Sequence, residues 1–158
     1  MSQRVDYTFH AGELFEQYLK LDTLIKSTLP KALSSLVTLR ASQLNGCAFC
    51  VDMHIKEAKL EGVDGLKIHH VAIWRESPLF DEKEKLALLW TETLTSLDGR
   101  GVSDEIYTKM CSMYDEREIS CLTFLISVIN GWNRLGVAFQ SVPGSADKAF
   151  GLDKVSFA

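Results

Sequence analysis

The residues best suited to chemistry are two cysteines and a histidine in segment 45–54, NGCAFCVDMH. If a helix begins near Gly46, then Cys47, Cys50 and His54 stand at positions i, i+3 and i+7, which share one helix face. A thiol attacks as its thiolate, and both the positive end of a helix dipole and a nearby imidazole stabilise that anion. The spacing therefore predicts a redox-active thiol pair with a base beside it.

The same cysteine spacing also occurs in haem-attachment and zinc sites, and two cysteines can simply pack in a core. Haem attachment requires a histidine directly after the second cysteine, and here Val51 occupies that position. Zinc would need a fourth ligand besides the three residues above, which His69 or His70 could supply. No second cysteine pair supports this, because Cys111 and Cys121 stand apart in apolar helical surroundings and are expected to pack in the core. We therefore favour a dithiol site without a metal or cofactor.

The composition is that of an ordinary globular domain. The chain has 158 residues, of which 46% are hydrophobic, enough for one domain with a sizeable core. Its 17 basic and 21 acidic residues give a net charge of -4 without a basic stripe, which argues against nucleic acid or an anionic membrane as partner. Neither a signal sequence nor a bilayer-spanning apolar segment is recognisable. We therefore expect a cytoplasmic protein, where a Cys-x-x-Cys pair points to catalysis or metal binding rather than to a permanent cross-link.

Apolar residues recur with helical periodicity along nearly the whole chain, without the alternation typical of strands, so we predict an all-α fold. The segment from Glu118 to Trp132 is apolar almost all round, which is typical of a helix buried centrally or between subunits. We expect a domain of residues 1–140, followed by a tail of residues 141–158 that docks on the domain or on a neighbouring subunit. The expected helices span about residues 14–28, 33–44, 46–61, 69–74, 81–97, 103–113 and 118–132.

Four segments of the chain resemble the AhpD-like (alkylhydroperoxidase D) branch of the carboxymuconolactone decarboxylase family. They are residues 39–54 around the cysteines, and the later segments 74–80, 86–95 and 129–134. Together they cover most of the chain up to about residue 139. The resemblance implies an AhpD-like multi-helix domain with the Cys-x-x-Cys pair at the start of a helix. It also implies a homo-oligomer: a dimer, trimer or hexamer of small subunits.

The resemblance further implies a role for each residue of the cysteine segment. Cys50 would be the peroxidatic thiol that attacks a hydroperoxide, Cys47 the resolving thiol that closes the disulfide, and His54 the proton relay. The expected activity is that of an antioxidant peroxidase acting on organic hydroperoxides or hydrogen peroxide. Its disulfide would be reduced by an outside dithiol, carried by a lipoyl-bearing or thioredoxin-like protein.

One position departs from the pattern of related peroxidases, which place a glutamate on the preceding helix to start the proton relay. Here that position is Ser35, whose hydroxyl has neither the charge nor the basicity of a carboxylate. Either another acid, Glu84 or Asp52, reaches His54, or peroxidase turnover is weakened.

Two alternative functions therefore stay open. One is a non-enzymatic redox sensor or partner-binding oligomer, in which the same disulfide changes shape or affinity. The other is decarboxylation of a muconolactone, ranked lower because those enzymes generally lack the cysteine pair. Asn45, directly before Gly46, is expected to cap the cysteine helix.

Overall fold

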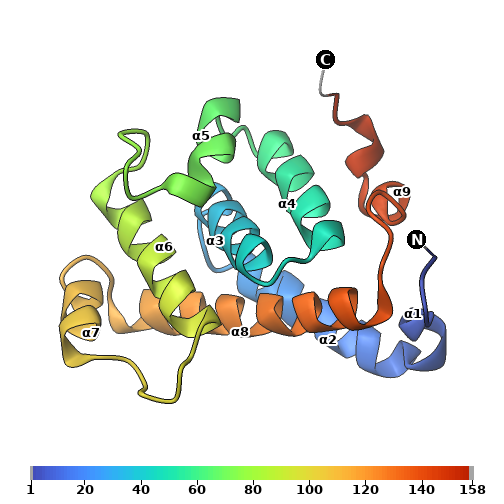
Figure 1. Cartoon of the computed structure of the whole chain (residues 1–158), viewed down its shortest axis with the longest axis horizontal. Helices are drawn as coiled ribbons and strands as arrows, with labels where there is room; N and C mark the ends of the chain where they lie inside the picture. The colour runs from blue at the N-terminus through green and yellow to red at the C-terminus, as the bar shows by residue number, and fades with distance from the viewer. Residues whose placement is uncertain (1, 157–158) are drawn as a thin grey trace.

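The computed structural model describes residues 2–156, and within this range all regular elements are helices (Figure 1), which confirms the all-α prediction. The predicted tail is accordingly described as far as Ser156, and its residues 157 and 158 lie outside the described part. The α-helices are α1 (Tyr7–His10), α2 (Gly12–Lys26), α3 (Lys31–Leu44), α4 (Ala48–Leu60), α5 (Gly65–His70), α6 (Glu82–Thr95), α7 (Asp104–Cys111), α8 (Glu116–Phe139) and α9 (Asp147–Phe150), with short 3₁₀ turns η1 (Val71–Ile73) and η2 (Leu152–Lys154).

Local signals in the sequence account for where several helices begin. Before α6, the Asp81 side chain accepts a hydrogen bond from the Glu84 backbone N–H at 2.8 Å, and the Glu84 side chain accepts one from the Asp81 N–H at 3.0 Å. Asp115 and Glu118 form the same reciprocal capping box at the start of α8. Each box satisfies backbone donors that a helix end would otherwise leave unpaired.

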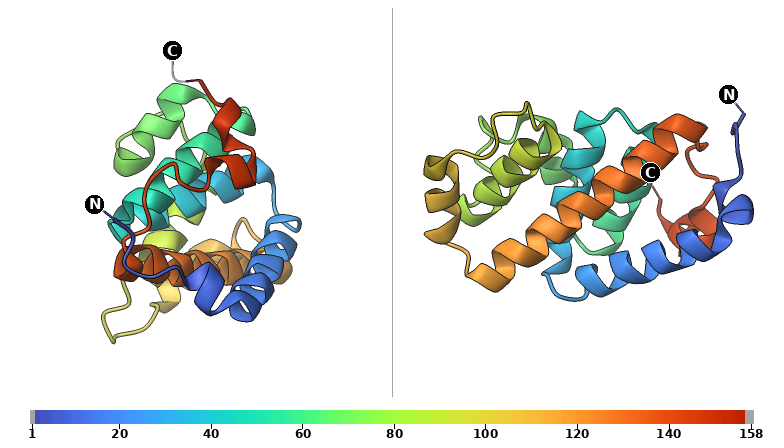
Figure 2. Two further views of the ribbon diagram at one scale, coloured as in Figure 1. Left: turned by 90° about the vertical axis from the view of Figure 1, so that its right-hand side faces the viewer. Right: turned by 90° about the horizontal axis from the view of Figure 1, so that it is seen from below.

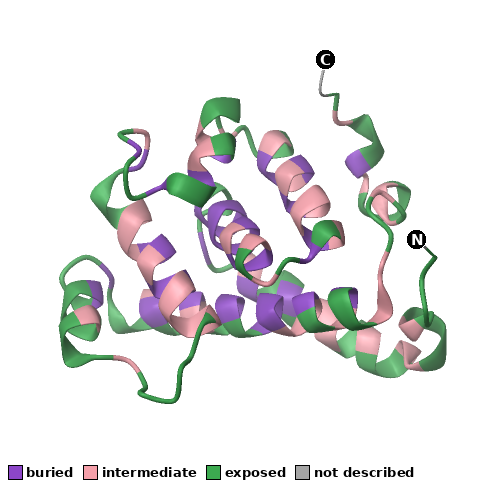
Figure 3. Ribbon diagram, in the orientation of Figure 1, coloured by how far each residue is buried: buried purple, intermediate pink, exposed green. Residues whose placement is uncertain are grey.

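Helix α3 lies at the centre of the fold, packed against α4, α6 and α8. Its residues Leu36, Val37 and Leu39 are fully buried, and purple buried segments run along α3 and along one face of α8 (Figure 3). Two apolar clusters meet at α3: one is shared with α2, α6 and α8, and the other lies toward α4 and the segment 68–80. This central helix positions α4, which carries the cysteines.

Helix α8 is longer and more one-sided than the sequence predicted. It continues seven residues beyond Trp132, to Phe139, because Asn133 and Gly136 extend its buried face. Its opposite face includes Phe124, which is 59% exposed, so the helix is not buried all round in the single chain.

The expectation for the two isolated cysteines was half right. Cys121 packs partly buried against the core, but the prediction of core packing was wrong for Cys111, which is exposed. Cys111 is the last residue of the amphipathic helix α7, whose buried position is its neighbour Met110. Adjacent residues of a helix face different directions, so only one of the two reaches the core.

Both end segments of the described chain lie on the same side of the molecule, the N-terminal one near the end of α8 and the C-terminal one beside α4 (Figures 1 and 2). The Arg4 backbone N–H donates to the Phe139 carbonyl at 2.8 Å, which fixes the N-terminal segment to the end of α8. After α8 the chain turns back to α4, where Asp147 forms an ion pair with Lys56 at 2.7 Å. None of the described helices has the length and apolar character of a membrane-spanning segment.

Candidate active site

The two cysteines lie at the N-terminal end of α4. Cys47 is the residue that caps the helix, Cys50 stands in its first turn, and a disulfide joins them with their Cα atoms 5.3 Å apart. The Cys50 backbone N–H donates to Cys47 Sγ at 3.3 Å. Gly46 has a φ of 64°, a left-handed conformation that glycine adopts without strain, and this lets the chain pass from α3 directly into α4. Once the pair is reduced, the positive end of the helix dipole favours a thiolate here.

Asn45 does not cap α4, because Cys47 holds the capping position and Asn45 ends α3 instead. Its side-chain N–H₂ donates to the Oδ1 atoms of Asn130 and Asn133 on α8, both at 2.9 Å. Asn133 in turn donates to Ser42 Oγ at 2.9 Å. A satisfied polar network of this kind favours one arrangement of the buried groups. It therefore fixes the turn that presents the cysteines to α8.

The disulfide is buried against α8 at Gly136. Cys47 is 2% and Cys50 3% exposed. A Cβ atom added at Gly136 would lie 2.8 Å from Cys47 Sγ and 3.3 Å from Cys50 Sγ, so the absence of a side chain is what admits the two sulfur atoms.

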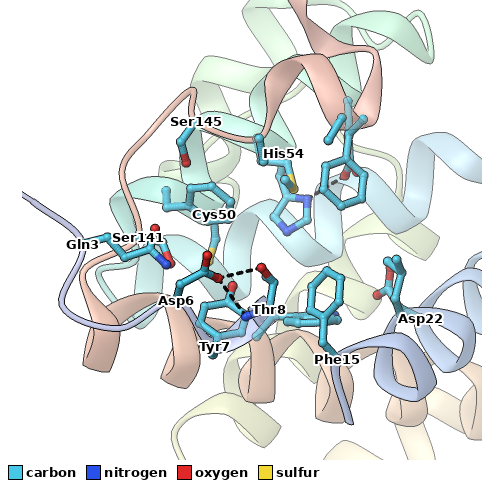
Figure 4. Close-up of a pocket in the computed structure, with 18 of the residues that line it drawn as sticks. Gln3, Asp6, Tyr7, Thr8, Phe15, Asp22, Cys50, His54, Ser141 and Ser145 are labelled. Carbon is cyan, nitrogen blue, oxygen red and sulfur yellow. Dashed lines mark hydrogen bonds and ion pairs between the residues drawn. The ribbon is translucent and has the colours of Figure 1, made fainter. Parts of the chain in front are cut away.

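Cys50 and His54 open onto one cavity of about 440 Å³, whereas Cys47 is not among the described residues that line it. Figure 4 shows Cys50 and His54 on one side of this cavity, with Tyr7 and Phe15 from the N-terminal part of the chain opposite. The walls are largely apolar and include Tyr7, Phe15, Phe49, Met53, Trp132 and Phe150. The cavity therefore suits a small molecule with an apolar body that presents a reactive group to Cys50.

His54 is held by an acid that the sequence analysis did not single out. His54 Nδ1 lies 2.6 Å from Glu57 Oε2, three residues further along α4. The His54 side chain is 5% exposed, so this contact is its main polar restraint inside the protein. The i,i+3 spacing on one helix is a local signal that could have identified the pair.

Lys26 of α2 completes the charge distribution around Glu57. Its Nζ lies 3.4 Å from Glu57 Oε1 and 3.3 Å from Asp22 Oδ2. Burial by itself would raise the pKa of Glu57, but His54 and Lys26 outweigh it and lower that pKa to about 2. Burial acts to lower the pKa of Lys26, and Glu57 and Asp22 reverse this and raise it. Glu57 is therefore a carboxylate, and Lys26 an ammonium, throughout the neutral range.

Neither of the two acids proposed to reach His54 does so. Asp52 instead pairs with Lys56 at 2.6 Å, as expected from their i,i+4 spacing. Glu84 belongs to the capping box of α6 and accepts a hydrogen bond from Lys67 at 2.6 Å.

The histidines proposed as a fourth zinc ligand lie in α5. The His70 ring is placed by Ser77, whose Oγ is 3.0 Å from His70 Nδ1. Across residues 2–156 there is no cluster of three or more His, Cys, Asp or Glu side chains that could hold a metal ion.

The segment after α8 supplies one wall of the cavity. Ser141, Ser145 and Phe150 line it, although they are far from the cysteines in sequence. Lys56 anchors this segment to α4 because its Nζ lies between Asp52 and Asp147, at 2.6 and 2.7 Å. Sequence periodicity carries no signal for such a wall, because it depends on how the chain returns to α4.

The described residues form an all-helical domain with a disulfide-capable cysteine pair at the start of a helix, and one of the two cysteines shares a cavity with a histidine of that helix. These features define a small helical thiol–disulfide domain. Residues 10–93 match the carboxymuconolactone decarboxylase family. The chain belongs to that family, and a solved structure at 35% identity supports the AhpD-like branch.

Proteins of known sequence or structure agree with this assignment. The uncharacterized protein YdfG of Bacillus subtilis is 35% identical over 139 residues, which cover 87% of this chain and 95% of YdfG. A solved structure from Agrobacterium tumefaciens, of unknown function and described as a putative antioxidant defence protein AhpD, is 35% identical with a TM-score of 0.86, covering 90% of this chain and 98% of that one. The debrominase Bmp8 shares the fold at 20% identity and a TM-score of 0.77, covering 94% and 80% of the two chains.

Proposed function

We propose that this protein is a thiol-dependent peroxidase that reduces organic hydroperoxides or hydrogen peroxide and closes a disulfide between Cys47 and Cys50. The observation that carries the proposal is that Cys50, and not Cys47, shares a largely apolar cavity with His54. A thiol that a substrate can reach, with a base beside it, suits the attacking role. A thiol buried behind it, within disulfide distance, suits the resolving role.

The proposed reaction begins when His54 accepts the proton of the Cys50 thiol. The thiolate attacks the terminal oxygen of the hydroperoxide, so that an S–O bond forms, the O–O bond breaks, and the leaving alkoxide takes the proton back from His54 as an alcohol. Cys50 is then a sulfenic acid. The Cys47 thiol attacks its sulfur, the S–O bond breaks, and the hydroxyl leaves as water with the Cys47 proton. Two thiols and one hydroperoxide thus yield a disulfide, an alcohol and water.

A dithiol reductant must then restore the two thiols. In the proposal one of its thiolates attacks Cys50 Sγ through the cavity and displaces Cys47, and its second thiol releases the mixed disulfide. The reductant belongs to the lipoyl-bearing or thioredoxin-like class, and the protein is expected to act as a homo-oligomer in the cytoplasm.

The test is consumption of cumene hydroperoxide by purified protein with dihydrolipoamide as reductant. Cys50→Ser is expected to abolish consumption, whereas Cys47→Ser is expected to stop after one turnover with a sulfenic acid that dimedone traps on Cys50. Cys111→Ser is the matched control, because its exposed thiol lies outside the cavity, and it should retain the full rate.

Full activity in Cys50→Ser would contradict the proposal. A disulfide that forms once per molecule, and that no dithiol recycles, would instead favour the redox-sensor alternative.

A further inference from the structure

We propose that Glu57 is the positioning residue for His54. It takes the role in the proton relay that a glutamate at the position of Ser35 has in related peroxidases. The inference rests on the proposed function for its reaction, but its geometry belongs to this chain. It assigns a role to a residue that the resemblance to the family did not include.

The contact between Glu57 and His54 determines which ring nitrogen is free. A carboxylate accepts hydrogen bonds, so the 2.6 Å contact requires the proton on His54 Nδ1. The lone pair of the neutral ring is then on Nε2, the nitrogen left for the cavity that His54 shares with Cys50. A carboxylate on one nitrogen fixes the tautomer and the orientation of the ring.

The charges around Glu57 keep it in the form that this role requires. On α2, Lys26 faces it and is itself balanced by Asp22. From α3, the hydroxyls of Ser34, Ser35 and Thr38 line a second cavity together with Glu57. Lys31 of the same helix also lines this cavity, and it is paired with Glu61 at 3.3 Å. The negative charge of Glu57 is thus stable, and it stabilises the imidazolium that forms when His54 takes the proton of the Cys50 thiol. In that step Glu57 stays ionised, and the proton stays on His54 until the alkoxide leaves.

Ser35 of α3 lines the same second cavity as Glu57 of α4. Ser35, Glu57 and Lys26 line one second cavity of about 390 Å³ between α2, α3 and α4. Ser35 is 6% exposed, so its side chain faces the interior rather than solvent. A longer side chain at position 35 therefore has space beside Glu57, and the two positions can be exchanged experimentally.

The experiment compares wild type, Glu57→Gln, and the double variant Ser35→Glu/Glu57→Gln. Two quantities are measured on the reduced proteins: the rate of Cys50 oxidation by cumene hydroperoxide, and the pH dependence of Cys50 alkylation by iodoacetamide, read from the Cys50 peptide by mass spectrometry. Glu61→Gln is the matched control, an acid one turn further along that lines the second cavity and contacts Lys31 instead of His54.

We expect Glu57→Gln to slow Cys50 oxidation by about 10–100-fold and to move alkylation to higher pH, because the thiolate loses its stabilised imidazolium partner. The double variant should recover at least part of the oxidation rate, and Glu61→Gln should match wild type. Wild-type behaviour of Glu57→Gln in both measurements would overturn the proposal, as would slower oxidation with an unchanged alkylation profile, which would indicate a merely structural role. If the double variant does not fold, the alkylation profile of Glu57→Gln compared with wild type is sufficient to test the role of Glu57.

The two measurements also separate this inference from the proposed function. Alkylation reports the state of Cys50 without any peroxide. A shifted profile in Glu57→Gln, together with a wild-type protein that does not turn over peroxide, would therefore uphold the Glu57–His54 pair and refute the peroxidase.

Discussion

The substitution Gly136→Ala tests whether α8 holds the oxidised and reduced forms of the cysteine pair differently. The new Cβ would lie 2.8 Å from Cys47 Sγ and 3.3 Å from Cys50 Sγ. Even two carbon atoms pack best at about 3.5–4.0 Å, and sulfur is larger. In the disulfide neither sulfur can turn away alone. In the dithiol no S–S bond holds Cys47 Sγ in place, so the contact can be relieved by a change of its side-chain rotamer.

The size of the effect follows from this difference. Overpacking a filled interior costs about 1–3 kcal/mol, and here that cost falls mainly on the disulfide. For a two-electron couple about 30 mV corresponds to 1.4 kcal/mol, so the reduction potential should become about 20–65 mV less negative. The higher helix propensity of alanine, worth about 1 kcal/mol, stabilises both redox forms and does not change this difference.

The assay is a redox titration against mixtures of reduced and oxidised glutathione, with the Cys47–Cys50 peptide read by mass spectrometry. Gly65→Ala is the matched control, because a Cβ at Gly65 meets nothing within 4 Å, and its potential should equal that of wild type. A folded Gly136→Ala protein with an unchanged or more negative potential would refute the argument that the disulfide depends on the missing side chain.

Three further substitutions test the supporting structure. Gly131→Ala places a Cβ on the hydroxyl of Tyr18 and breaks its 2.8 Å hydrogen bond to the Val128 carbonyl, so we expect a loss of about 1–3 kcal/mol in urea unfolding. Asp147→Asn removes one anion from Lys56 and should speed hydrogen exchange in the segment after α8, with wild-type protection as the contrary result. The pKa of Glu57 is lowered from 4.5 to about 2, so its ionised form adds about 3 kcal/mol to the free energy of unfolding above pH 4.5. This contribution is lost as the pH falls toward 2. Glu57→Gln should therefore be less stable than wild type near pH 7, with a difference that shrinks in acid; a constant difference in urea unfolding would contradict this.

The sequence predicted those features of the fold that local signals determine. Apolar periodicity identified the long helices, and Asp81 marked the start of α6 because its side chain satisfies backbone donors three residues on. The end of α8 was missed because Asn133 and Gly136 interrupt the apolar pattern while remaining buried, a result of contacts with α3 and the disulfide.

Only the part of the candidate site that local sequence signals determine was predicted. The approach of Cys47 to Cys50 follows from their spacing, but the acids named as partners of His54 were Glu84, on another helix, and Asp52, which faces away from His54 and pairs with Lys56. Glu57 was within reach of a local rule, whereas Lys26 was not, since it comes from α2. The cavity walls likewise join segments from both ends of the chain, and only tertiary packing decides that.

Placing Cys50, His54 and Glu57 on the single helix α4 has a consequence for motion. The distances among the three are fixed by one ladder of backbone hydrogen bonds, so thermal sliding of helices past one another carries all three together. A relay divided between two helices changes its spacing whenever those helices shift. Here a shift of α2 or of the segment after α8 against α4 would move the walls of the cavity and leave the spacing of the three groups along α4 unchanged.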